Sequence, residues 1–281
     1  MPTIVVGIPK KKMGLTPPKH YYCSMIPMGI DQNSPLLQAR LLQARLLFGE
    51  ERFDRYLSDT SDDVAQALEL CRLNQHYAGL LHSQLGYVEL AVRNSIDRQL
   101  QTLSLAETGT RDWTTEHKVP HLVNTLITRM LRQARAHASN DANLRTSRQS
   151  HRENNAVNHA DVLSQLMWGT WVKLIGMPAH NARNNDQQEL WRISTRLAFP
   201  NVSQDETGRM LVARQLEYLR TVRNNEAHYN TLYFEASQVN SIIGTCYALL
   251  NAIDCNLRQG WLKPKLLRSC AHNIRTLASN S

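Results

Sequence analysis

Residues 61–100, SDDVAQALELCRLNQHYAGLLHSQLGYVELAVRNSIDRQL, decide the fold of this chain. Their large apolar side chains recur at steps of three and four residues, the period of an α-helix with one buried face. These side chains are Leu70, Leu73, Tyr77, Leu81, Val88, Val92, Ile96 and Leu100. Ser61 or Asp62 can cap the start of the helix. Because this stretch exceeds the length of a usual globular helix, we expect a break near Gly79 or Gly86.

Further stretches of the chain carry the same helical period. A Ser-Gln-Asp-Glu capping box at residues 203–206 opens one of them. The other predicted helices cover residues 121–137, 161–175, 187–197 and 235–257. No segment longer than a few residues alternates apolar and polar side chains as a strand does. The sequence therefore predicts an all-α fold.

The distribution of proline and polar residues suggests three regions. Six of the ten prolines precede residue 36, so residues 1–35 are expected to be extended or poorly ordered. A helical domain is expected over residues 36–235, interrupted at 138–160 by an Asn-rich polar insertion loop. Residues 236–281 are expected to form a C-terminal helical extension.

Composition and charge limit the possible functions. Lys and Arg number 32 against 24 Asp and Glu, which leaves a net charge of +8 and favours a polyanionic partner such as nucleic acid. No window approaches the roughly 18 consecutive apolar residues of a transmembrane helix, so no membrane association is expected. The five cysteines are odd in number and lack a C-x-x-C pair, which is typical of a reducing, cytoplasmic protein without disulfides or a Cys-rich zinc site.

The segment LRTVRNNEAHYN, residues 219–230, contains Arg223 and His228 five positions apart. In a chain with 24 Arg and 11 His, about one such pair is expected by chance, 24/281 × 11, and Arg132 with His137 is another. On one helix, residues five apart point about 140° away from each other, whereas Asn224 and His228 lie one turn apart on one face. An Asn amide can orient an imidazole for proton transfer. The alternative is a solvated helix end.

Five segments, in order, resemble the Abi-like family of HEPN proteins, which is named for abortive infection of phage-infected bacteria. They are FGEERFDRYL (48–57), LGYVELAVRNSIDRQL (85–100), LSQLMWGTWVKLIG (163–176), ELWRISTRLAFP (189–200) and LEYLRTVRNNEAHYNTLY (216–233). The resemblance covers residues 48–235 and implies a HEPN-type helical bundle with a variable N-terminal segment.

The resemblance also implies a metal-independent endoribonuclease that needs no cofactor and acts as a toxin or phage-defence effector. His228 would be the general acid or base, Arg223 would stabilise the transition-state charge, and Asn224 would orient His228 or the scissile phosphate. Arg220 would bind RNA nearby. A homodimer would oppose two copies of the motif, and a protein or RNA antitoxin is a further expected partner.

A second group of residues is expected to pack beside the motif in such a bundle. Glu89, Arg93 and Asn94 belong to the long predicted helix and would contact RNA or form a structural ion-pair network. Asn225 and Glu226 depart from the family pattern, and Glu226 would either weaken phosphate attraction or pair with Arg223. Two alternatives to catalysis therefore stay open: a non-catalytic RNA-binding or regulatory HEPN module, and an interaction scaffold.

Overall fold

A computed structural model describes residues 34–145, 156–176, 183–228 and 230–278. Every regular element within these ranges is helical, which confirms the all-α prediction. The predicted N-terminal segment, apart from its last two residues, lies outside the described part, as does the middle of the predicted insertion. No helix in the described ranges is long and apolar enough to cross a membrane.

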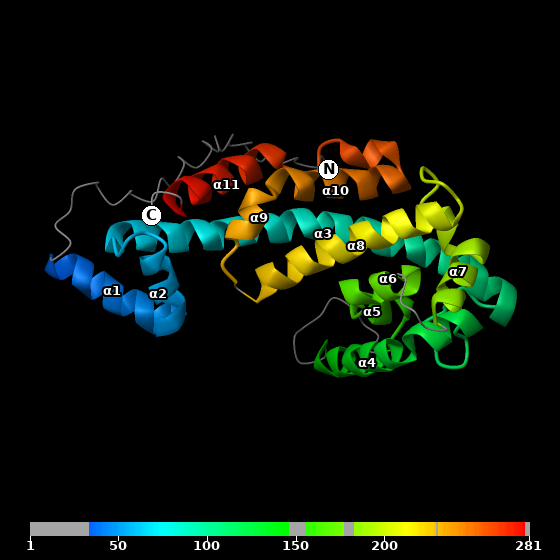
Figure 1. Cartoon of the computed structure of the whole chain (residues 1–281). Helices are drawn as coiled ribbons and strands as arrows, with labels where there is room; N and C mark the ends of the chain where they lie inside the picture. Colours follow the sequence, from blue (N-terminus) through cyan, green and yellow to red (C-terminus); the bar gives the residue numbers. More distant parts are fainter. Residues whose placement is uncertain (1–33, 146–155, 177–182, 229, 279–281) are drawn as a thin grey trace, which may run out of the picture.

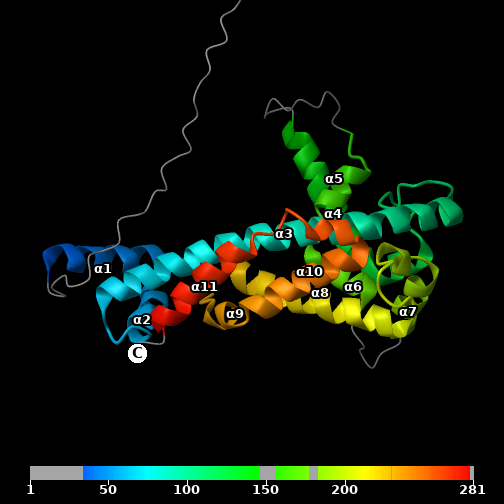
Figure 2. The same ribbon diagram turned by 90° about the horizontal axis from the view of Figure 1, so that it is seen from above.

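Helix α3 (Val64–Thr108) is the central element and runs along the molecule (Figures 1 and 2). Its 45 residues correspond to a length of roughly 68 Å. The predicted break is wrong, because the helix continues through both glycines. Gly79 and Gly86 have no atom within 4 Å of an added Cβ, so neither serves a close approach. A helical glycine costs only about 1 kcal/mol, and the buried residues on either side outweigh it.

The remaining helices surround α3 (Figure 1). Their bounds are α1 (Pro35–Phe48), α2 (Glu50–Ser58), α4 (His121–Arg145), α5 (His159–Ser164), α6 (Trp168–Ile175), α7 (Arg183–Ile193), α8 (Glu206–Ala227), α9 (Tyr233–Ser237), α10 (Val239–Ile253) and α11 (Pro264–Ala278), with the short 3-10 helices η2 (Thr195–Ala198) and η3 (Cys255–Arg258). Helices α10 and α11 pack on α3, and their apolar residues join the same hydrophobic cluster as those of α1 to α8. The C-terminal helices are thus part of the main core.

Buried polar side chains on α3 attach distant segments to it. Asn74, which is fully buried, accepts from the Leu232 amide at 2.7 Å and donates to the Asn230 carbonyl at 3.1 Å. Ser95 donates to the Ala198 carbonyl at 2.8 Å, and the Gln84 side chain accepts from the Lys263 amide. Since a buried polar group without a partner is costly, these bonds favour one register of each segment against the helix.

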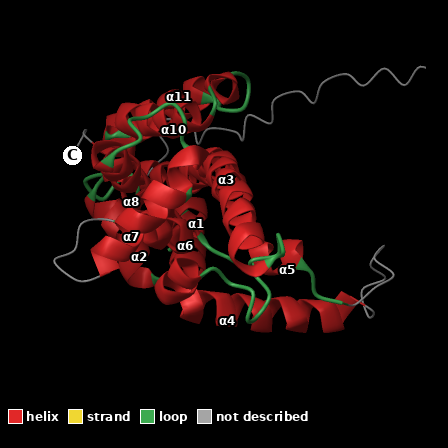
Figure 3. Ribbon diagram, turned by 90° about the vertical axis from the view of Figure 1, so that its right-hand side faces the viewer, coloured by secondary structure: helices red, strands yellow, loops and turns green. Residues whose placement is uncertain are grey.

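The region around α4 differs from the prediction. Helix α4 lies at the edge of the molecule and packs on α5, α6 and α7 (Figure 3). It extends to Arg145, so residues 138–145 of the predicted insertion loop are helical. Ala138 and Ala142 are buried, whereas the polar residues between them are exposed. Burial of these two alanines is enough to continue the helix. The sequence suggested a loop because Ser and Asn surround them.

Several predicted helix boundaries also need correction. Asp63, rather than Ser61 or Asp62, caps α3 by accepting from the Gln66 amide. Asp205, rather than Ser203, caps α8 by accepting from the Thr207 and Gly208 amides. The predicted helix over 161–175 is two helices, α5 and α6, with a short connection between them. The predicted helix over 235–257 is divided into α9, α10 and η3.

Candidate functional site

The predicted motif occupies the last two turns of α8 and the residue that follows. Leu216, Leu219 and Val222 are buried and fix the orientation of the helix. With the helix in this orientation, Arg223 and Asn224 are half-buried at the edge of its contact with α3. The helix ends at Ala227, which is exposed, as is His228 after it.

His228 is the C-terminal cap of α8 and its side chain is exposed. Its backbone amide donates to the Asn224 carbonyl at 3.0 Å. The side chains of Asn224 and His228 make no hydrogen bond to each other, so the structure does not join them as the sequence analysis expected. The imidazole is accessible to solvent at the end of the helix.

Glu226 points from α8 toward α3 and is nearly buried. Its Oε2 atom lies 3.3 Å from Nδ1 of His82, a residue near the middle of α3 whose side chain is 70% exposed. Of the two roles considered for Glu226, pairing with Arg223 is replaced by this contact with His82. A second accessible imidazole is thus bound to the motif helix two residues before His228.

Glu89 lies on α3, two turns beyond His82, and shares its surroundings with Arg223 and Arg93. Burial raises the pKa of Glu89, and the charges of Arg223, Arg93 and His82 oppose that increase. A backbone hydrogen bond from Trp168, the first residue of α6, acts in the same direction as those charges. Three of the predicted residues, Glu89, Arg93 and Arg223, are therefore brought together at the junction of α3, α6 and α8.

The other predicted residues lie at the margin of this group. Arg220 is one turn before Arg223 and is paired with Glu217, to which its Nε donates at 2.9 Å and its Nη2 at 2.5 Å. Glu217 raises the pKa of Arg220 through this hydrogen bond. Asn94 is exposed and accepts from Nε of its neighbour Arg93 at 3.3 Å. Arg220 is therefore already neutralised by a carboxylate of its own helix.

The turn that follows the motif is held in place by side chains. Asn225 donates to Oε1 of buried Glu235 at 2.7 Å, and its carbonyl accepts from the Asn230 amide at 3.1 Å. Asn74 then binds the backbone at Asn230 and Leu232, as described above. Asn225 is thus a structural residue that ties the end of α8 to α9.

We define the motif cluster as His82, Glu89, Arg93, Arg223, Glu226 and His228. Its formal charges balance when both histidines are neutral, with two guanidinium groups against two carboxylates. The two imidazoles are exposed and the two guanidinium groups are half-buried. An imidazole can transfer a proton, and a guanidinium can bind a phosphate with a planar fork of donors. The arrangement is suited to proton transfer beside a bound phosphate.

Sequence reasoning missed His82. A signal was present, because His82, Glu89 and Arg93 are spaced seven and four residues apart and so form a polar stripe on one face of α3. Nothing in the sequence places this stripe opposite residues 223–228, however. Comparisons of the chain with protein-family models, with curated proteins and with solved structures give no match.

Proposed function

We propose that the protein is a metal-independent endoribonuclease with the motif cluster as its active site. The observation that carries this proposal is the position of two accessible imidazoles at one helix end: His228 caps α8, and His82 contacts Glu226 within the preceding turn. Arg223 lies one turn earlier. The resemblance to Abi-like HEPN proteins supports the same chemistry for Arg223, Asn224 and His228.

In the proposed reaction the ribose 2′-hydroxyl attacks the adjacent phosphorus. The P–O5′ bond breaks and leaves a 2′,3′-cyclic phosphate and a 5′-hydroxyl. One imidazole accepts the proton of the 2′-hydroxyl and the other donates a proton to the departing O5′. Arg223 neutralises the charge that develops on the phosphoryl oxygens. His228 takes one of these proton-transfer roles, and either His82 or a partner's copy of His228 takes the other.

The biological role that fits this activity is a cytoplasmic toxin or phage-defence effector. The net charge of +8 favours RNA as the substrate. A homodimer that opposes two copies of α8, and a protein or RNA antitoxin that blocks them, belong to the same proposal. Both rest on the family resemblance.

The first test is cleavage of a single-stranded RNA by the purified chain in the presence of EDTA. We expect His228→Ala to reduce the rate at least 100-fold, since removal of a general acid or base typically costs that much. His272→Ala is the matched control, because His272 is exposed on α11. Cleavage that persists in His228→Ala would remove the motif cluster from consideration as the active site.

A non-catalytic RNA-binding module is the second candidate, and the charge balance favours it. Glu89 shares its surroundings with Arg223, and Glu217 pairs with Arg220, so fewer positive charges face solvent than the sequence indicates. Under this reading no RNA is cleaved, and Arg223→Ala weakens RNA binding in a filter-binding assay. Cleavage by the unaltered chain decides against it.

A further inference from the structure

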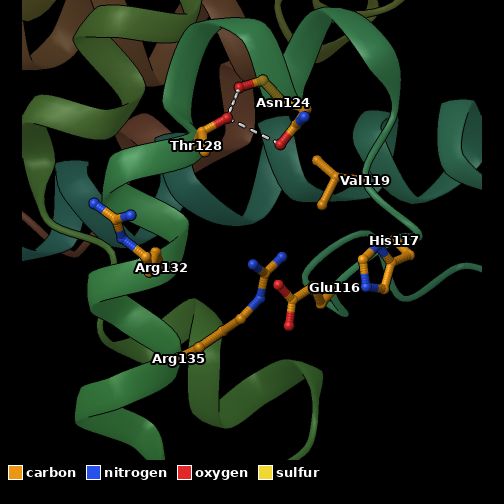
Figure 4. Close-up of a pocket in the computed structure, with 7 residues that line it drawn as sticks. All are labelled: Glu116, His117, Val119, Asn124, Thr128, Arg132 and Arg135. Atoms are coloured by element: carbon orange, nitrogen blue, oxygen red, sulfur yellow. Dashed lines mark hydrogen bonds between the residues drawn. The ribbon is translucent and has the colours of Figure 1, made fainter.

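A second polar site lies on the face of α4 that is opposite its buried face. A cavity of about 500 Å³ separates α4 from the segment that connects it to α3 (Figure 4). It is lined by Glu116, His117, Val119, Asn124, Thr128, Arg132 and Arg135. None of these residues belongs to the motif cluster. We propose that this cavity binds a small phosphate ester, of the size of a sugar phosphate.

The wall formed by α4 is a polar stripe. Asn124, Thr128, Arg132 and Arg135 follow one another at steps of four, four and three residues, so they lie on one face of the helix. Asn124, Thr128 and Arg132 are exposed and Arg135 is half-buried, and a second segment of the chain lies opposite them across the cavity (Figure 4). The stripe thus presents its donors to a partly open cavity whose volume is within the range of known small-molecule sites.

Arg135 is an incompletely satisfied donor in this wall. Its Nε atom donates to the Thr114 carbonyl at 2.6 Å, which fixes the guanidinium in place. Its Nη2 atom is buried and has no hydrogen-bond partner. Buried polar atoms in folded proteins are nearly always paired, so an orphaned guanidinium nitrogen indicates a missing acceptor. The anionic oxygens of a phosphate are strong acceptors for such a fork.

Arg132 supplies a second guanidinium, one turn before Arg135. It is exposed, and it makes no hydrogen bond or ion pair within the described part of the chain. Three of the remaining lining residues add a donor or a charge. Asn124 carries an amide, His117 an imidazole, and Glu116 the carboxylate that faces Arg135 in Figure 4. Two Arg against one Glu leave the cavity positive overall.

The backbone around the cavity departs from regular geometry on both walls. Helix α4 is kinked at Ile127, where φ is −130° and ψ is 19°. The Thr128 hydroxyl bonds to the Asn124 carbonyl and, at 2.9 Å, to its side-chain Oδ1, as Figure 4 shows. His117 has a φ of +64°, a left-handed conformation that non-glycine residues seldom adopt. Such departures gather at ligand sites more often than elsewhere.

The lining favours a sugar phosphate over a nucleotide or an RNA strand. Among the described residues, the lining contains no Phe, Tyr or Trp on which a base would stack, and stacking platforms are the usual means of holding single-stranded nucleic acid. Val119 provides a small apolar contact, and Asn124 and Glu116 provide groups that bond to sugar hydroxyls. Phosphate recognition by two guanidiniums and hydroxyl recognition by an amide and a carboxylate therefore meet in one cavity.

The test is isothermal titration calorimetry with inorganic phosphate and with ribose 5-phosphate, in a buffer of low chloride. We expect both to bind, ribose 5-phosphate more tightly, and Arg132→Ala to weaken both at least tenfold. Arg129→Ala is the control, because Arg129 is an exposed residue of the same helix outside the cavity. Glu116→Gln should strengthen binding severalfold, since it removes the one opposing charge and preserves the shape.

Three outcomes would overturn the proposal. The first is that neither probe gives a heat of binding at about 10 mM, which is ten times the upper end of ordinary substrate concentrations. The second is an equal loss of binding in Arg129→Ala and Arg132→Ala, which would indicate a general effect of net charge. The third is a single-stranded RNA that binds through Arg132 while neither small probe does. Circular dichroism of each variant separates loss of the site from loss of the fold.

Discussion

His159 provides the sharpest test of the packing of α5 against α3. Its Nε2 atom lies 2.8 Å from Oδ1 of Asp97, and its Nδ1 atom lies 3.1 Å from Oδ1 of Asp112. Asp97 also accepts from the Trp113 indole at 2.7 Å and from Gln101 at 2.8 Å. One imidazole thus joins two carboxylates from different segments, and we predict that His159→Gln destabilises the protein in a pH-dependent way.

The direction of the pH dependence follows from the pKa shifts. Burial lowers the pKa of His159 and is the largest single influence, but the hydrogen bonds and charges of Asp97 and Asp112 together outweigh it and raise the pKa above 6.5. For Asp97, burial raises the pKa, and the bonds from His159, Trp113 and Gln101 outweigh it, so that the pKa falls below 3.8. The pKa of Asp112 is also lowered from 3.8, where burial is outweighed by hydrogen bonds that include one from His159.

These shifts define a pH window for the stabilisation. A raised histidine pKa gives a contribution that is complete below pH 6.5 and is lost as the pH rises through the folded-state pKa. Lowered carboxyl pKa values give contributions that are present above pH 3.8 and are lost as the pH falls through the folded-state values. The three groups are therefore all charged, and the network is strongest, between pH 3.8 and pH 6.5.

The magnitude can be worked from the two bonds. A hydrogen bond to a charged group contributes about 1.5–3 kcal/mol, and a neutral one about 1 kcal/mol. Gln at position 159 can donate to one of the two carboxylates and loses the other bond. The His159 side chain is 21% exposed, so the lower part of the range for a bond to a charged group applies. We therefore expect the free energy of unfolding to fall by about 2 kcal/mol at pH 5.5. At pH 9 the wild-type imidazole is neutral, and the loss should be under about 1 kcal/mol.

The measurement is urea-induced unfolding of the wild type and His159→Gln at pH 5.5 and pH 9. His76→Gln is the control, since His76 is exposed on α3 and should change the free energy of unfolding by less than about 0.5 kcal/mol at either pH. An equal loss at the two pH values, or a larger one at pH 9, would refute a protonated His159 between two carboxylates.

Two further predictions concern buried polar residues. Asn74→Ala leaves the Leu232 amide and the Asn230 carbonyl without partners, and we expect a loss of about 2–4 kcal/mol in urea unfolding together with faster hydrogen exchange at Leu232. Arg209→Met removes a fully buried guanidinium whose Nη1 binds the Ile175 and Gly176 carbonyls at 2.6 and 2.7 Å. Thermal unfolding should show a loss of about 3 kcal/mol because both buried carbonyls lose their donor, whereas the half-exposed Glu206 adds little when it loses its ion pair. A cost below about 0.5 kcal/mol in either variant would contradict the assigned bonds.

The helical fold could be predicted from the sequence because each amphipathic stripe is a local property. The stripe in residues 61–100 is visible before any contact is known, and the caps at Asp63 and Asp205 lie within two residues of their predicted positions. The prediction went wrong where local propensity and tertiary burial disagree. Gly79 suggested a break, and the polar residues after His137 suggested a loop, but burial of neighbouring side chains maintains the helix at both places.

The candidate site was only partly predictable because it depends on how α3 and α8 meet. The motif on α8 is continuous in sequence, and so Arg223, Asn224 and His228 could be identified from it. The contact of His82 with Glu226 joins residues 144 positions apart. Only the docking of the two helices establishes that pair, and the same docking sets Glu89 near Arg223, where its carboxylate opposes the guanidinium charge.

The bonds around the end of α8 do not by themselves distinguish an active site from a structural turn. Asn74, Asn225 and Glu235 hold the turn so that α9 to α11 can return along α3, and any protein of this topology would need such bonds. What they add for function is position, because they fix the end of the helix that carries the exposed His228. A structural turn requires no accessible imidazole, whereas this one directly follows the exposed His228, and Glu226 before it contacts the exposed His82 on α3. The proposed catalytic function therefore depends on the exposed histidines and not on the buried bonds.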